Sequence, residues 1–251
     1  MLNCYFEAKV TIQIMFSIPE KLQAVHEIIG NATAMASRPA DSVKLLAVSK
    51  TFGADAVLAA AAAGQRAFGE NYLQEALDKM IAVKAARAGV PTVDALEWHF
   101  IGPIQSNKTK AIAEHFDWVH TIEREKIAQR LSDQRPPELP PLNVCLQVNI
   151  SGEASKSGVT PDQALAVAQM IAALPHLTLR GLMAIPEPTA DVARQRAAFR
   201  QVRELFLKLQ QNGLMLDTLS MGMSADMDAA IAEGATIVRI GSAIFGQRDY
   251  A

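Results

Sequence analysis

Residues 45–53 read Leu-Leu-Ala-Val-Ser-Lys-Thr-Phe-Gly, an apolar run that ends in a short polar segment. This pattern is typical of a buried strand that passes into a loop, and it places Lys50 where the strand ends. Loops after strands carry function more often than strand interiors do. At the mouth of a barrel, a desolvated lysine amine can lose its proton and attack a carbonyl. The alternative is a surface lysine that happens to close a strand.

Short apolar segments of this kind recur eight times along the chain, and amphipathic helical patterns separate them. The strands are expected at residues 44–49, 66–69, 98–102, 117–121, 143–150, 178–185, 217–221 and 236–240. The helices are expected at residues 17–37, 54–63, 71–87, 107–115, 123–133, 161–173, 190–211 and 225–233. Strict alternation of this kind implies a parallel sheet, because parallel strands need crossover connections.

Capping residues support several of these helices. Ser17 with Glu20 has the spacing of a capping box, and Thr160, Pro161 and Gln163 give an N-cap, a first-turn proline and the same spacing. Glycines fall just past three expected helix ends, where a left-handed residue is needed, at Gly64, Gly213 and Gly234.

The predicted fold is a single (β/α)8 TIM barrel over residues 15–251, with the helix at 17–37 filling the open position in the helical ring. A doubly wound open sheet is the alternative fold, but the chain has no Gly-x-Gly-x-x-Gly turn after an early strand. Residues 1–14 are expected to be an extension outside the fold, because Ser17 begins the first clear helical pattern.

Composition excludes several classes of function. The chain has 251 residues and a formal net charge of −2, which offers no general attraction to nucleic acid or to an anionic membrane. The five histidines are dispersed, so no metal site can be argued. Cys4 and Cys145 make no disulfide framework, and Cys145 lies in an apolar strand. No uncharged apolar run approaches the length of a membrane span, and the chain is expected to be cytoplasmic.

Small and polar residues gather after the expected strands, whose carboxyl ends converge on one face of a barrel. Gly222, Met223 and Ser224 precede a helix, and Gly241 and Ser242 follow the last strand, so their N–H and hydroxyl groups are suited to hold an anion. The alternative for Ser224 is that it only caps its helix. Other strand ends contribute polar and apolar groups near Lys50, among them Asn71, Met183 and Ser220.

Arg239 lies inside the last expected strand, two residues before Gly241. Its side chain must point into the site or outward to a salt bridge, and the sequence alone does not decide between the two. Beside a pyridine ring, an arginine would donate to the ring nitrogen and keep that nitrogen unprotonated.

Taken together, these segments resemble the pyridoxal phosphate homeostasis proteins, also called the YggS or PROSC family. The resemblance covers about residue 17 to Tyr250. It rests on residues 45–51, 68–75 (Phe-Gly-Glu-Asn-Tyr-Leu-Gln-Glu), 97–108, 155–159, 180–186, 219–227 and 238–246.

The resemblance implies a fold type III barrel like the N-terminal domain of alanine racemase, with pyridoxal 5′-phosphate (PLP) on Lys50 as an internal aldimine. It assigns the phosphate to Ser224, Gly241 and Ser242 and the pyridine nitrogen to Arg239. The full set of expected cofactor-binding residues is Lys50, Asn71, Met183, Ser220, Gly222, Ser224, Arg239, Gly241 and Ser242. Lys156 is a weaker candidate for a second basic contact.

Two functions of different classes follow from this resemblance. The first is a non-catalytic protein that binds, buffers and supplies PLP and is linked to the balance of amino acids and keto acids. Such a protein is expected to be a monomer, and its expected partners are apo-forms of PLP-dependent enzymes. The second is a PLP-dependent racemase or decarboxylase. The carrier is favoured, because eight βα units use up the chain and leave no residues for the second domain that supplies the opposite-face tyrosine in alanine racemase. A barrel enzyme for another phosphorylated metabolite would leave Lys50 and Arg239 without defined roles.

Overall fold

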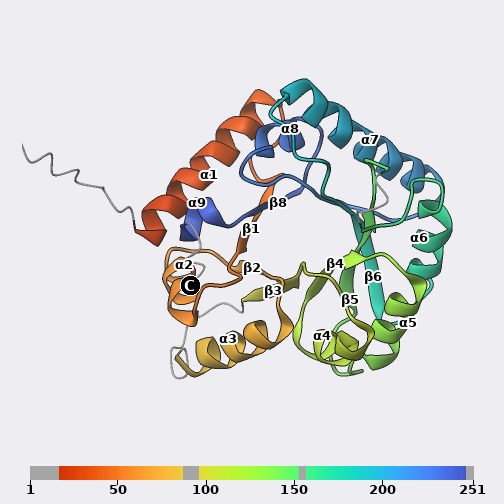
Figure 1. The fold of residues 1–251 in the computed structure, drawn as a ribbon, viewed down its shortest axis with the longest axis horizontal. Helices are drawn as coiled ribbons and strands as arrows, with labels where there is room; N and C mark the ends of the chain where they lie inside the picture. Colours follow the sequence, from red (N-terminus) through yellow and green to blue (C-terminus); the bar gives the residue numbers. More distant parts are fainter. Residues whose placement is uncertain (1–16, 87–95, 153–156, 247–251) are drawn as a thin grey trace, which may run out of the picture.

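The computed structural model describes residues 17–86, 96–152 and 157–246. Within them, eight parallel strands close into a barrel in chain order, and β1 pairs with β8 to complete it. Figure 1 shows the helices as a ring around these strands. The closed barrel confirms the predicted fold and excludes the doubly wound open sheet. The strands are β1 (Lys44–Val48), β2 (Ala67–Glu70), β3 (Glu97–Phe100), β4 (Trp118–Ile122), β5 (Leu142–Val148), β6 (Leu177–Ala184), β7 (Thr218–Ser220) and β8 (Ile237–Ile240).

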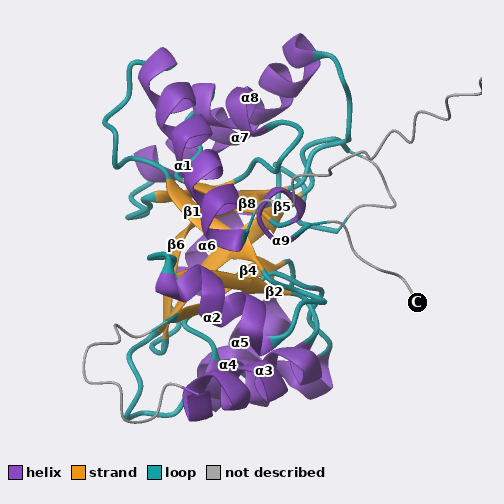
Figure 2. Ribbon diagram, turned by 90° about the vertical axis from the view of Figure 1, so that its left-hand side faces the viewer, coloured by secondary structure: helices purple, strands orange, loops and turns teal. Residues whose placement is uncertain are grey.

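Helices lie outside the strands, and Figure 2 shows them on both sides of the barrel. Each expected strand and helix is present, and the strand ends differ from the predicted ends by two residues at most. The helices are α1 (Ile18–Met35), α2 (Ala54–Ala62), α3 (Leu73–Ala86), η1 (Ser106–Lys108), α4 (Thr109–His115), α5 (Glu125–Gln134), α6 (Ala164–Ala172), α7 (Val192–Gln211), α8 (Met227–Ala232) and α9 (Ser242–Phe245).

The first helix closes the helical ring, as the sequence predicted. Ser17 caps α1, and its side chain and the Glu20 side chain form the expected capping box. Leu22, Val25 and Ile29 are the buried apolar residues of this helix. They pack α1 between α2 on one side and α8 and α9 on the other, so the helix occupies the position left open by the chain's eight βα units. Residues 1–14, predicted to lie outside the fold, are not among the described residues.

The start of α6 and the additional helix α9 are the largest differences between the helices and the prediction. The sixth helix begins at Ala164 with Gln163 as its N-cap, so the prediction of Thr160 as the N-cap was wrong. Residues 161–163 form a turn instead, and the Thr160 N–H donates to Gln163 Oε1 across it (3.4 Å). The short helix α9 was not expected. The three glycines after helix ends have the predicted left-handed conformation, with φ of 99° at Gly64, 88° at Gly213 and 99° at Gly234.

Alternation along each strand separates two buried faces. On β1, Leu45 and Ala47 join the large core cluster that the strands share with the helices. Leu46 belongs to a separate small cluster with Ala67 and Ile237, on the other face of the sheet, inside the barrel. Lys44, Leu46 and Val48 therefore share the inner face, and Lys50 continues this series beyond the strand.

None of the helices in the described ranges is long and apolar enough to cross a membrane.

Candidate functional site

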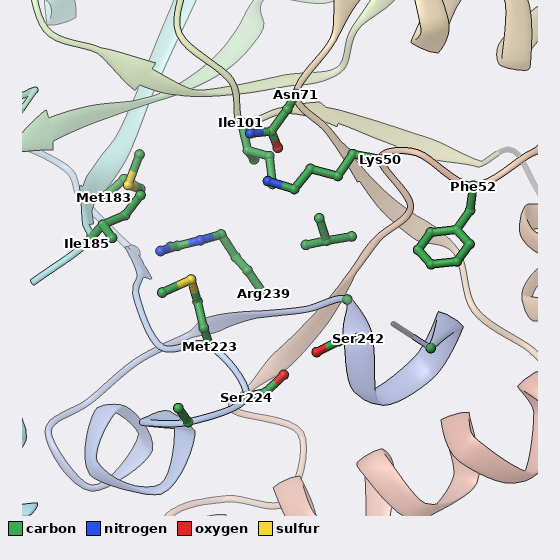
Figure 3. A pocket seen from close by; sticks show the side chains of 14 residues that line it. Lys50, Phe52, Asn71, Ile101, Met183, Ile185, Met223, Ser224, Arg239 and Ser242 are labelled. Carbon is green, nitrogen blue, oxygen red and sulfur yellow. The ribbon is translucent and has the colours of Figure 1, made fainter. Parts of the chain in front are cut away.

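A cavity of about 440 Å³ lies at the carboxyl ends of the strands. Residues from the loops after β1, β2, β3, β6, β7 and β8 surround it, which is where a parallel barrel carries its binding sites. Figure 3 shows Lys50, Asn71 and Arg239 directed into this space from the ends of different strands. The lining consists of Val48, Lys50, Phe52, Asn71, Ile101, Met183, Ile185, Met223, Ser224, Ala225, Arg239, Gly241, Ser242 and Gly246.

The backbone on both sides of Lys50 is held in place by side chains of β2 and α3. Ser49 Oγ donates to Glu70 Oε1 (2.6 Å), and the Ser49 carbonyl accepts from Lys79 Nζ (2.8 Å). After Lys50, the Thr51 N–H donates to Glu75 Oε1 (2.6 Å). Thr51 has a φ of 69°, which is a rare conformation for a β-branched residue. These contacts fix the direction in which Lys50 leaves the strand.

The three side chains that hold this loop form an ionic cluster in which Lys79 and Glu70 are buried and Glu75 is partly exposed. Lys79 Nζ lies 2.6 Å from Glu70 Oε1 and 3.0 Å from Glu75 Oε1. Burial raises the pKa of Glu70, and the ammonium group of Lys79 and the hydrogen bonds from Lys79 and Ser49 oppose that shift. Lys79 was not predicted from the sequence, although Glu75 and Lys79 have the i, i+4 spacing of a helical ion pair.

Arg239 points into the barrel, which decides the alternative left open by the sequence. Its Nη1 donates to the Ser220 carbonyl (2.6 Å) and to Ser220 Oγ (2.9 Å), and its Nη2 donates to the Ala184 carbonyl (3.1 Å). Burial lowers the pKa of Arg239 to about 10, so the group remains a cation at neutral pH. The cavity therefore contains a positive charge held by neutral acceptors.

Ser224 lies on the loop after β7 and Ser242 at the start of α9, just after the neighbouring β8, and both line the cavity. The N-cap of α8 is Asp226, whose Oδ1 accepts from the Met223 N–H (2.6 Å). Capping therefore does not account for Ser224, which stays exposed beside the cavity. Gly241 precedes the first turn of α9, and the first N–H groups of a helix have no acceptor within the helix.

The structure brings together most of the residues that the sequence analysis selected. Those that line the cavity are Lys50, Asn71, Met183, Ser224, Arg239, Gly241 and Ser242. Ser220 and Gly222 do not line it. Ser220 is fully buried beneath Arg239, and Gly222, at a φ of 96°, forms the turn that precedes Ser224. Lys156 lies outside the described residues.

Sequence reasoning missed the apolar wall of the cavity. Phe52 follows Lys50 and packs against Phe245 of α9, with ring centroids 5.3 Å apart. Ile185 and Met223 complete this wall from the loops after β6 and β7. Their positions after strands were visible in the sequence, but nothing there separated apolar lining residues from ordinary surface residues. Asn71 Oδ1 is buried and has no hydrogen-bond partner among the described residues, so it is available to a ligand.

Comparison with known proteins gives matches over almost the whole chain. The family model described as the N-terminal domain of alanine racemase matches residues 22–249. A pyridoxal phosphate homeostasis protein of Pseudomonas aeruginosa is 61% identical over 236 residues, which is 94% of this chain and 98% of the relative.

Solved structures agree with the fold. PipY of Synechococcus elongatus, solved with PLP bound, is 37% identical, has a TM-score of 0.77, and is matched over 92% of this chain and 100% of its own. Alanine racemase of Corynebacterium glutamicum is 21% identical with a TM-score of 0.61, and 92% of this chain covers 62% of that one. The latter likeness concerns the barrel fold alone.

Proposed function

This chain belongs to the family of pyridoxal phosphate homeostasis proteins, and on that premise we propose that it binds PLP in the cavity beside Lys50 and supplies it to other proteins without converting an amino acid. The observation that carries this proposal is the meeting of Lys50, Arg239, Ser224 and Ser242 around one cavity. These residues come from parts of the chain that are almost two hundred positions apart, and only the closed barrel joins them.

The lining residues fit a planar aromatic molecule with an aldehyde and a phosphate. Lys50 offers an amine and Arg239 a donor, and the two serines follow the adjacent strands β7 and β8, beside the N–H groups near Gly241. Phe52, Ile101 and Met183 offer apolar surface between these polar groups. The buried, unpartnered Asn71 Oδ1 can accept a hydrogen bond from a ligand hydroxyl.

Each polar residue then has a defined role toward the cofactor. Lys50 Nζ would bond to the aldehyde carbon of PLP with loss of water, as lysine does with carbonyl compounds. Arg239 would donate to the pyridine nitrogen, which keeps that nitrogen unprotonated. Ser224, Ser242 and Gly241 would bind the phosphate, where hydrogen bonds to a charged group are strong.

The arrangement favours a carrier over an enzyme. Bound PLP supplies an electron sink in enzymes, and a ring nitrogen that an arginine keeps unprotonated makes a poor one. Racemisation also needs an acid or base on each face of the substrate. Tyr72, the one tyrosine within the described residues, is exposed just before α3 and does not line the cavity. Among the described residues that line the cavity, this leaves Lys50 as the base for one face of a substrate.

Absorption spectroscopy and mass mapping test this proposal. The purified protein with PLP should develop the visible band of lysine-bound cofactor, and borohydride reduction followed by peptide mapping should place the adduct on Lys50. Lys50→Ala should lose the band and retain weaker binding through the phosphate. Lys108→Ala, which changes an exposed lysine at the end of η1, serves as the control and should leave both unchanged. A main adduct on Lys108 or Lys156 would overturn the assignment of Lys50.

A further inference from the structure

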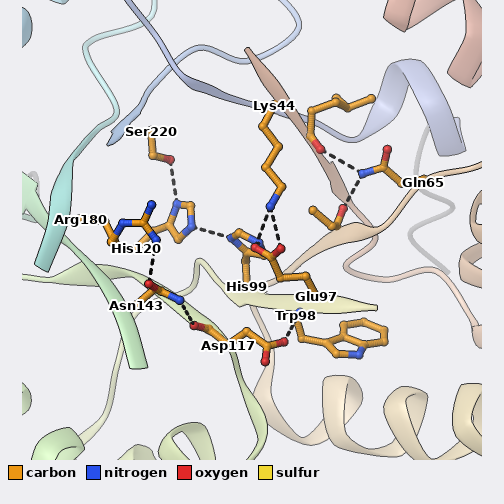
Figure 4. Close-up of polar contacts among 12 residues, drawn as sticks. Lys44, Gln65, Glu97, Trp98, His99, Asp117, His120, Asn143, Arg180 and Ser220 are labelled. Carbon is orange, nitrogen blue, oxygen red and sulfur yellow. Dashed lines mark hydrogen bonds and ion pairs between the residues drawn. The ribbon is translucent and has the colours of Figure 1, made fainter. Parts of the chain in front are cut away.

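A continuous chain of hydrogen bonds crosses the interior of the barrel, from Arg239 at the cavity to Glu97 at the opposite end, and Figure 4 shows its part from Ser220 to Glu97. It starts at Arg239, whose Nη1 donates to Ser220 Oγ (2.9 Å). Ser220 Oγ lies 2.7 Å from His120 Nδ1, and His120 Nε2 lies 2.8 Å from His99 Nδ1. The chain ends where His99 Nε2 lies 2.7 Å from Glu97 Oε1. Five side chains from β3, β4, β7 and β8 are thus linked.

The two ends of this chain decide where each proton lies. Lys44 Nζ also contacts both oxygens of Glu97, at 2.8 and 2.7 Å. Burial alone would raise the pKa of Glu97, but the hydrogen bond from His99 and the Lys44 ammonium outweigh burial and lower its pKa to about 2. A carboxylate can only accept, so His99 must donate through Nε2.

The remaining protons follow in order. A neutral His99 that carries its proton on Nε2 accepts at Nδ1, so His120 must donate through its own Nε2. His120 then accepts at Nδ1 from the Ser220 hydroxyl. Ser220 Oγ in turn accepts from Arg239, which can only donate. Every hydrogen bond therefore points from Arg239 toward Glu97, and each one joins one donor to one acceptor.

The surroundings favour neutral rings for both histidines. His99 and His120 are completely buried. Burial lowers the pKa of His99, although Glu97 opposes the shift, and burial together with His99 and Arg239 lowers the pKa of His120 well below its usual range. His99 is also stacked on Trp118, with centroids 5.3 Å apart, and Arg180 covers the Trp118 ring. The His99 ring therefore has little freedom to turn.

We propose that His120, acting through Ser220, is a positioning residue that fixes the orientation of Arg239 in the cavity, and that His99 and Glu97 hold His120 in the required tautomer. The role toward PLP rests on the function proposed above, whereas the tautomers do not. The bonds to Ser220 and Ala184 use three of the five N–H groups of Arg239, and two remain without a hydrogen bond within the described part of the chain. These two are the groups that a ligand can engage.

The tautomers can be measured without any cofactor. In protein labelled with ¹⁵N-histidine at neutral pH, both His99 and His120 should be neutral, with hydrogen on Nε2 and none on Nδ1. His99→Gln and His120→Gln assign the resonances. Hydrogen on Nδ1 of either ring, or an imidazolium, would break the one-way chain and overturn the proposal.

Variants test whether the chain positions Arg239. His120→Leu leaves the Ser220 hydroxyl without its acceptor and should weaken PLP binding about tenfold. It should also shift the ¹⁵N resonance of the bound pyridine nitrogen. His120→Asn restores an acceptor near the position of Nδ1 and should return both readouts toward wild type. Thr33→Val, which removes a buried hydroxyl bonded to Ile29 in α1, controls for a general loss of stability and should not shift the resonance.

The outcomes separate this inference from the proposed function. If the wild type does not bind PLP, the proposed function fails, and the tautomer measurement still tests the direction of the hydrogen bonds between Arg239 and Glu97. If the wild type binds and His120→Leu shows the same affinity and the same ring-nitrogen resonance, the positioning role is wrong. If His120→Leu does not fold, Ser220→Ala removes the hydroxyl between His120 and Arg239 and should change both readouts in the same way, and no change in either would overturn the positioning role.

Discussion

Ser224 and Ser242 present hydroxyl groups from two segments that directly follow the neighbouring strands β7 and β8. Each would give one hydrogen bond to a charged phosphate, worth about 1.5–3 kcal/mol. Ser224→Ala and Ser242→Ala should therefore each weaken PLP binding roughly tenfold or more, measured by spectroscopic titration. Thr178→Ala, an exposed hydroxyl near the other end of the barrel in β6, should change nothing. Unchanged affinity in both serine variants would mean that the phosphate lies elsewhere.

For individual residues, the sequence predicted the polar members of the site better than its apolar ones. Lys50, Ser224 and Ser242 follow strands that the apolar pattern locates, so their convergence follows from the barrel. Phe52 and Ile185 could not be assigned, because apolar residues near strand ends are as common on an ordinary surface. The inward direction of Arg239 depends on which face of β8 it occupies. That follows from the register of a closed barrel and is not visible in one strand alone.

The loop between β1 and α2 depends on a neighbouring element for its shape. Lys79 of α3 is almost fully buried and contacts Glu70, Glu75 and the Ser49 carbonyl. Lys79→Met removes the cation and leaves Glu70 buried without its ionic partner. Removal of one member of a buried pair costs about 3–5 kcal/mol. The free energy of unfolding in urea should fall by about that amount, while Lys84→Met, at an exposed site on α3, should change it by less than about 0.5 kcal/mol. An equal effect of the two variants would show that the cluster does not stabilise the loop.

Element positions were predictable because strand and helix patterns differ in period, whereas some helix ends were not. Thr160, Pro161 and Gln163 have the residue types of a helix start, but the chain makes a turn there and the helix begins at Ala164. The four-residue helix α9 is too short to produce a period in the sequence.

Closure of the barrel brings into contact residues whose proximity cannot be read from the sequence. His99 and His120 are 21 positions apart and were judged dispersed, yet β3 and β4 are adjacent and the rings meet inside the barrel. The register between those strands is a property of the whole closed sheet, and a single sequence does not specify it. The hydrogen-bond chain beneath Arg239 could therefore not be foreseen.

The two buried histidines should make the stability of the whole molecule depend on pH. In the unfolded chain their pKa is about 6.5, and in the folded protein burial lowers it. Below that value the unfolded state binds protons that the folded state does not, so the free energy of unfolding falls as pH decreases and is fully retained above it. Each histidine contributes up to about 1.4 kcal/mol per pH unit.

Urea unfolding between about pH 7.5 and pH 5.5 measures this contribution as the difference from variants. His99→Gln and His120→Gln remove the titrating groups, so the loss of stability over this range should be smaller in each variant than in the wild type. His115→Gln, at an exposed position, should keep the wild-type slope. A wild-type slope in all three variants would mean that the buried rings already carry a proton in the folded protein.

The whole barrel also bears on whether the protein turns over amino acids. Racemisation and related reactions remove the α-proton, and any such step exchanges that proton with solvent. Since Lys50 is the base offered by the described lining and Arg239 stays a cation, we expect no exchange above the background of Lys50→Ala when the PLP-loaded protein meets L- or D-amino acids in deuterated water. Exchange at enzyme-like rates that vanishes in Lys50→Ala would contradict the carrier function.

The supply of PLP to other proteins has its own measurement. PLP-loaded protein mixed with the apo-form of a PLP-dependent enzyme should restore that enzyme's activity. Failure with every acceptor, together with an intact cofactor band, would leave storage of PLP without transfer.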